Sequence, residues 1–108
     1  MKILNQFTMN IPARSANESF ARAAVAAFAS QLDPTLEEIS DIKTAVSEAV
    51  TNCIVHAYRE TPGKIYICCT LCEGNELRIK IRDSGCGIEN IDMAMEPMFT
   101  TVGGERAG

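Results

Sequence analysis

The sequence predicts an α+β fold that combines helices with a sheet. Two observations support this prediction. Apolar residues recur at helical spacing from Leu36 to about Tyr58, whereas residues 64–72 and 77–83 alternate in the manner of strands. The chain has 108 residues, of which 46% are hydrophobic and 22% charged, so we expect one globular domain over 1–108.

Charge and hydropathy argue against two classes of partner. The net charge is -4 and no basic stripe occurs, which argues against direct nucleic-acid binding. No apolar run is long enough to span a bilayer, and the first residues do not form a basic-then-apolar leader. We therefore expect a cytoplasmic protein with no membrane partner.

The first third of the chain is predicted to form a strand and a helix. Residues 1–11 alternate loosely, and Pro12 ends that strand. Ser15 and Glu18 have the spacing of a capping box, which predicts a helix reaching about Gln31. The face of this helix that we expect to be buried carries Phe20, Ala24, Ala27 and Phe28.

The central helix carries the most informative polar residues. Thr35 and Glu38 form a second capping box, so this helix is predicted from Leu36. Glu48 and Asn52 are four residues apart and lie one turn above the other, beside the apolar stripe. A carboxylate and a carboxamide in this arrangement can point into a cleft together. The apolar stripe comprises Ile39, Ile42, Ala45, Val46, Ala49, Val50, Cys53, Ile54 and Ala57.

The second half is predicted to begin with a hairpin. Residues 64–72 and 77–83 form its strands, and the turn lies at 73–75. Leu77, Ile79 and Ile81 share one face, and Asp83 follows them at the same parity, so its carboxylate should point inward. We expect residues 88–96 to form a short helix or turn, and 98–108 to form a mobile loop.

A glycine-rich turn follows Asp83. Gly85 and Gly87 allow positive φ angles and close approach of a ligand to the backbone. A turn with a locally hydrogen-bonded Asp explains the same residues, so this segment alone is weak evidence of a site.

Five cysteines permit a metal site, but their placement does not favour one. Cys68, Cys69 and Cys72 fall within a predicted strand, where Cys69 points away from the other two. Zinc sites usually have paired cysteines on turns, so we interpret these residues as reduced thiols.

If the central helix packs on the inner face of the sheet, Glu48, Asn52 and Asp83 border one pocket. Carboxylate and carboxamide oxygens suit Mg²⁺, and backbone amides of glycine turns suit phosphates. A buried Asp can accept a hydrogen bond from an exocyclic amine. The sequence therefore predicts a nucleotide site.

These segments resemble those of a known superfamily. Residues 48–52, Glu-Ala-Val-Thr-Asn, look like the N box of the GHKL ATPases, and residues 83–87 look like their G1 box. Residues 17–22, 31–35 and 97–101 are similar to the branch of sporulation anti-sigma factors that are serine kinases. This resemblance implies an α/β two-layer sandwich with a mixed, mostly antiparallel sheet and helices on one face. It also implies a longer chain, with a last helix and strands that this sequence lacks.

The resemblance implies a role for each site residue. Glu48 would be the general base or orient the attacking hydroxyl, Asn52 would bind Mg²⁺, and Asp83 would accept from the adenine amino group. Gly85 and Gly87 would shape the pocket under the base. Thr100, Thr101 and residues 103–108 would form the ATP lid, and Arg106 would reach the terminal phosphate. Gly108 would be the first glycine of the segment that follows the lid.

The resemblance also implies partners. The protein would bind and inhibit a sigma factor of the F type, and use Mg-ATP to phosphorylate a serine of an anti-anti-sigma protein. Arg22 would contact these partners, and the protein would form a homodimer. Alternatives are a catalytically inactive module that sequesters sigma, the ATPase domain of another GHKL enzyme, or a cysteine-based metal or redox protein.

Overall fold

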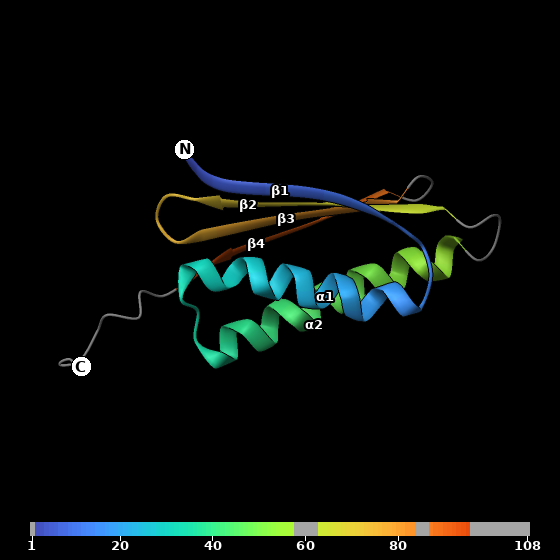
Figure 1. The fold of residues 1–108 in the computed structure, drawn as a ribbon, viewed down its shortest axis with the longest axis horizontal. Helices are drawn as coiled ribbons and strands as arrows, with labels where there is room; N and C mark the ends of the chain where they lie inside the picture. The colour runs from blue at the N-terminus through green and yellow to red at the C-terminus, as the bar shows by residue number, and fades with distance from the viewer. Residues whose placement is uncertain (1, 58–62, 84–86, 96–108) are drawn as a thin grey trace.

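The computed structural model describes residues 2–57, 63–83 and 87–95, which form two layers. Helices α1 (Ala16–Ala29) and α2 (Leu36–Ala57) lie together on one face of a four-stranded sheet (Figure 1). A short 3-10 turn, Ser30–Leu32, follows α1 and leads into the connection to α2. The predicted two-layer α+β fold, with helices on one face of the sheet, is confirmed.

The sheet consists of four strands in sequence order, and each neighbouring pair is antiparallel. None of the described strands pairs in parallel. The four strands are β1 (Ile3–Pro12), β2 (Lys64–Cys72), β3 (Glu76–Asp83) and β4 (Gly87–Ala94). The hairpin turn between β2 and β3 is confirmed: Gly74 and Asn75 have φ angles of 83° and 59°, values that suit glycine and asparagine.

The hydrophobic core lies between the helix layer and the inner face of the sheet. Strand parity places Leu77, Ile79 and Ile81 of β3 in this core, as predicted. Their neighbours Arg78, Lys80 and Arg82 are exposed on the outer face. The apolar stripe of α2 is confirmed at its centre, where Ile42, Val46, Ala49, Val50, Cys53 and Ile54 are buried.

The start of α2 is fixed by the predicted capping box. The Glu38 backbone N–H donates to Thr35 Oγ1 at 3.0 Å, and the Thr35 backbone N–H donates to Glu38 Oε1 at 2.8 Å. These two bonds satisfy amide groups that have no partner within the helix. The helix therefore begins at Leu36, as the sequence predicts.

The corresponding prediction for α1 is wrong in two respects. Ser15 has helical φ and ψ angles and makes no side-chain capping bond, and the Glu18 carboxylate pairs with Arg22 and Ser47. The buried face is also rotated from the one predicted, since Phe20 is 55% exposed and Ala27 is exposed. The side chains of α1 that are buried in the core are Ala21, Val25, Ala26 and Ala29.

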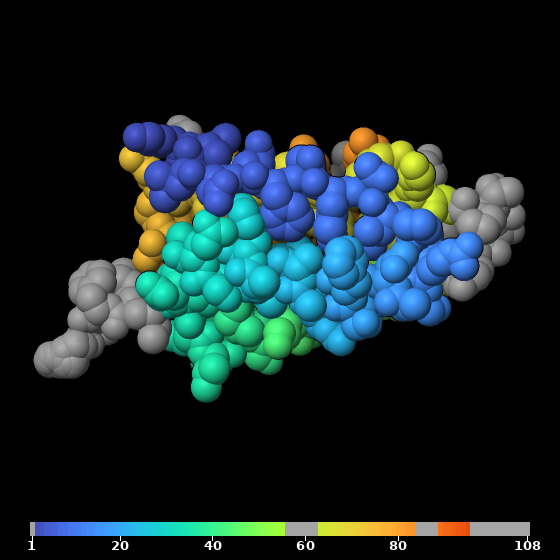
Figure 2. All heavy atoms as spheres, viewed as in Figure 1, coloured from blue at the N-terminus to red at the C-terminus, as the bar shows by residue number. Residues whose placement is uncertain are grey.

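Small residues on this face let α1 lie close to α2 and to the sheet. Phe28 is an exception, because it lies at the edge of the layer and meets Phe7 of β1. Their rings are 4.7 Å apart in an edge-to-face arrangement. The space-filling view shows α1 packed alongside β1 (Figure 2).

The prediction of a helix or turn at 88–96 is also wrong over its described part, since 87–94 form β4. Its Glu, Asn and Asp residues have low strand propensity. Pairing with β3 overrides that preference, because β4 is in register with it from Gly87 opposite Asp83 to Ala94 opposite Glu76. The Met95 backbone N–H then donates to the Asn75 carbonyl oxygen at 2.7 Å. The predicted loop at 98–108 lies outside the described residues.

Candidate functional site

Glu48 and Asn52 lie on the solvent-facing side of α2, and both are exposed. Together with Ser47 and Thr51 they line an open depression of about 400 Å³, which we call the α2 depression. The helical spacing of four residues stacks the carboxylate and the carboxamide at this surface, as predicted. Their oxygen atoms are the type of ligand that Mg²⁺ takes in proteins.

A polar network joins this depression to α1. The Ser47 hydroxyl donates a hydrogen bond to Glu18 Oε2, and Arg22 Nη1 donates to Ser47 Oγ at 3.3 Å. Arg22 Nη1 also lies 3.2 Å from the same Glu18 oxygen, one helical turn away on α1. The network is part-buried, and it fixes Arg22 next to the turn of α2 that carries Glu48.

The sequence alone does not reveal this network. By its pattern Arg22 is one exposed arginine on a helix, but the structure places it half-buried against α2. Glu18 fits a capping box by spacing, and Ser47 is notable only as the residue before the N-box segment. The spacing of four between Glu18 and Arg22 is a usable signal for their ion pair, whereas the contact with Ser47 depends on helix packing.

Asp83 ends β3 on the inner face of the sheet, as its parity predicts. It is 9% exposed and is the one buried acidic residue in the described part of the chain. Its register neighbours are Ile65 of β2 and Gly87 of β4. Asp83 is not among the described residues that line the α2 depression, and both features lie on the helix side of the sheet.

Most of the predicted glycine and lid residues lie outside the described part of the chain. Gly87 is described only by its backbone, which pairs with β3. The other five lie outside the described residues: Gly85, Thr100, Thr101, Arg106 and Gly108.

Cys68 and Cys69 are thiols in β2, and the strand places them on opposite faces of the sheet, as predicted. Cys69 is buried on the inner face, whereas Cys68 is half-buried on the outer face. Burial raises the pKa of Cys69 to about 12, and the charge of the neighbouring Cys68 is a second, smaller cause of this increase. Among residues 2–57, 63–83 and 87–95, no group of His, Cys, Asp and Glu is placed to hold a metal. Within the same ranges, no helix is both long and apolar enough to cross a membrane.

Comparison with known proteins identifies relatives of the chain. Residues 11–104 match the model of the histidine kinase-like ATPase domain family. An anti-sigma F factor of Thermoanaerobacter sp. (strain X514) is 56% identical over 109 residues, an alignment covering 100% of this chain and 76% of that protein. An anti-sigma F factor of Clostridium acetobutylicum is 56% identical over 97 residues, covering 90% of this chain and 67% of that protein.

Proposed function

Because the chain belongs to the histidine kinase-like ATPase domain family, and within it to the anti-sigma F factors, we propose that it is an ATP-dependent serine kinase that also sequesters a sigma factor. The phosphoryl group of Mg-ATP would pass to a serine of an anti-anti-sigma protein in the cytoplasm. The relatives' name supports the sigma-binding part of this proposal. The matched domain family supports ATP binding.

The observation that carries the kinase part is the pairing of Glu48 and Asn52 at the α2 depression. The Asn52 carboxamide oxygen would hold Mg²⁺, which neutralises phosphate charge when it is bound. The Glu48 carboxylate is exposed and accessible to a protein substrate. It would orient the attacking serine hydroxyl and accept its proton.

The base of the nucleotide would lie toward the sheet. The buried Asp83 carboxylate would accept a hydrogen bond from the adenine amino group, and Gly85 and Gly87 would let the base approach the backbone. We propose that Thr100, Thr101, Arg106 and Gly108 contact the phosphates. In phosphoryl transfer, proteins act mainly by positioning the reactants and stabilising charge, and these residues suit that task.

Arg22 is proposed to contact the protein partners. Its guanidinium is partly exposed and is held by Glu18 and Ser47, beside the depression that would contain the γ-phosphate. A partner that reaches Arg22 would therefore be close to Glu48. We also propose a homodimer, as the relationship to anti-sigma F factors suggests.

Calorimetric titration of the protein with Mg-ADP tests the nucleotide site. We expect one site, with binding weakened at least tenfold by Asp83→Asn and by Asn52→Ala. Thr44→Ala, one turn before Glu48 on the exposed side of α2, is the matched control and should bind normally. Unchanged binding of Mg-ADP in the first two variants would refute the nucleotide site. The anti-sigma role is tested separately, and it would be refuted if the unmodified protein failed to bind a sigma factor.

A further inference from the structure

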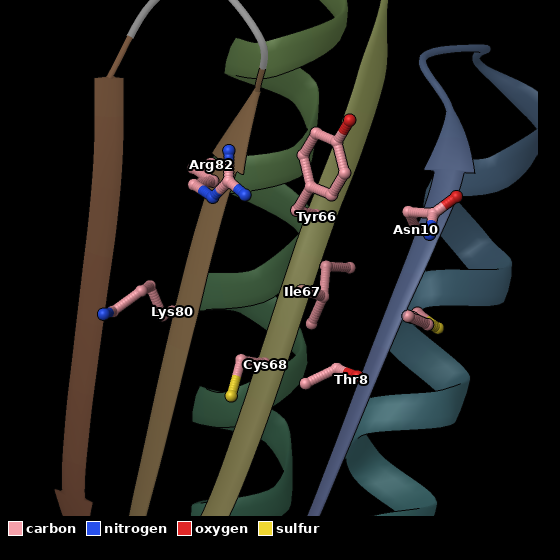
Figure 3. A pocket seen from close by; sticks show the side chains of 8 residues that line it. Thr8, Asn10, Tyr66, Ile67, Cys68, Lys80 and Arg82 are labelled. Carbon is pink, nitrogen blue, oxygen red and sulfur yellow. The ribbon is translucent and has the colours of Figure 1, made fainter.

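The outer face of the sheet, opposite the helices, contains a second hollow. It has a volume of about 240 Å³ and crosses β1, β2 and β3; we call it the outer-face pocket. Figure 3 shows its side chains coming from three strands, with Tyr66 and Arg82 side by side. The polar residues that line it are Thr8, Asn10, Tyr66, Cys68, Lys80 and Arg82.

Two positive charges of this pocket have no acidic residue directly opposite them in the described part of the sheet. Lys80 lies between Cys68 and Asn90 in register, and Arg82 lies between Tyr66 and Ile88. Arg78, on the same face of β3, differs because it pairs with Glu76 at 3.7 Å. In a chain with a net charge of -4, such a pair of cations at one hollow favours an anionic ligand.

The arginine of the pair is already oriented. The Arg82 guanidinium carbon lies 4.3 Å from the centre of the Tyr66 ring, so the cation rests on the aromatic face. A guanidinium held in this way loses less side-chain entropy when it binds, and its planar set of N–H donors suits a phosphate or carboxylate. Lys80 is two residues away on the same face and adds a mobile ammonium group.

The opposite wall of the pocket supplies neutral donors. Thr8 and Asn10 of β1 present a hydroxyl and a carboxamide across β2 from the two cations. Donors on two walls can reach several oxygens that point in different directions. The oxygens of a tetrahedral phosphate point in several directions and can accept hydrogen bonds from both walls. The two oxygens of a planar carboxylate can be paired by the donors of one wall.

We propose that the outer-face pocket binds the phosphate group of a small phosphomonoester or of inorganic phosphate. Arg82 is its main anchor, Lys80 its second cation, and Thr8 and Asn10 its neutral donors. This site is distinct from the proposed nucleotide site, because it lies on the sheet face away from α2 and the α2 depression.

Titration with inorganic phosphate, followed by ¹H–¹⁵N NMR at constant ionic strength, tests the proposal. We expect saturable shifts at the amides of residues 8–10, 66–68 and 80–82. Arg82→Gln should raise the Kd about tenfold, and Arg82→Lys should have an intermediate effect because charge remains without the planar donors. Arg78→Gln removes the same charge from the same face of β3 and should leave the Kd within twofold.

Two results would overturn the proposal. The first is equal weakening by Arg78→Gln and Arg82→Gln, which would indicate general screening of a basic face. The second is an absence of saturable shifts on the outer face together with a change in sedimentation of Arg82→Gln, which would assign this face to a second copy of the chain. A parallel titration with glucose 6-phosphate distinguishes a monoester site, which binds both compounds, from one that accepts only the free ion.

Discussion

Ser47 donates a hydrogen bond to the Glu18 carboxylate, and this contact joins α2 to α1 at the residue before Glu48. Arg22 completes the network by contacting both groups. The proposed partner-binding side chain and the proposed general base are therefore connected through a single serine. A partner that binds Arg22 would therefore contact a side chain that is hydrogen-bonded to the turn of α2 that carries Glu48.

Replacing Ser47 with alanine should lower the free energy of unfolding by about 1 kcal/mol, because a part-buried hydrogen bond between the helices is lost. Urea unfolding measures this change. Ser40→Ala is the matched control, since Ser40 is an exposed serine of the same helix. Equal effects of the two substitutions would show that the contact with Glu18 contributes no stability.

The two helix starts should respond differently to loss of a hydroxyl. Thr35→Ala removes a capping bond at the start of α2 and should cost about 1 kcal/mol. Ser15→Ala should cost clearly less, because Ser15 makes no side-chain capping bond at α1. Thermal unfolding of both variants measures the difference, and a larger loss for Ser15→Ala would contradict the capping geometry.

Stability should fall at alkaline pH because of Cys69. Burial raises its pKa from 9.0 to about 12, so above pH 9 the unfolded chain releases this proton while the folded protein keeps it. The stabilisation is complete below the unfolded pKa and is lost as pH rises toward the folded pKa, by up to about 1.4 kcal/mol per pH unit. Urea unfolding between about pH 8 and about pH 10.5 measures this loss of stability, because the range includes the pH at which the loss begins.

Cys69→Ala should flatten this pH dependence, although it also lowers stability at neutral pH through the loss of buried volume. Cys68 is half-buried on the outer face, and Cys68→Ala provides the comparison. This variant should retain most of the dependence of stability on pH. An unchanged slope in Cys69→Ala would mean that other groups cause the alkaline loss.

Arg22→Ala should weaken sigma-factor binding at least tenfold while costing less than about 1 kcal/mol of stability, because the ion pair with Glu18 is partly exposed. Surface plasmon resonance with the immobilised sigma factor measures the affinity. Arg14→Ala changes an exposed arginine just before α1 and should bind almost normally. Equal losses in both variants would assign the effect to net charge.

Strand parity and one capping box can be predicted from the sequence because both are local patterns. Alternation alone assigns Asp83 to the buried face beside Ile81, and Thr35 with Glu38 defines the start of α2. The side chains of a strand point alternately to its two faces, so the buried residues Leu77, Ile79 and Ile81 fix the side on which Asp83 lies.

The features that the sequence does not predict depend on contacts between distant segments. Strand β4 exists because β3 offers it a complete register, despite residues that disfavour a strand. Glu18 turns to Ser47 rather than capping its own helix, and the choice follows from how α1 packs on α2. The outer-face pocket likewise needs β1 and β3 to be placed on either side of β2.

Transfer of radiolabelled γ-phosphate from Mg-ATP to the anti-anti-sigma protein tests the proposed kinase activity. Glu48→Gln keeps the size of the side chain and removes its basicity, so we expect transfer at least a hundredfold slower, with sigma binding retained. Glu37→Gln, at the exposed first turn of the same helix, should transfer phosphate normally. Normal transfer by Glu48→Gln would contradict its assignment as the base, and no transfer by the unmodified protein would contradict the kinase itself.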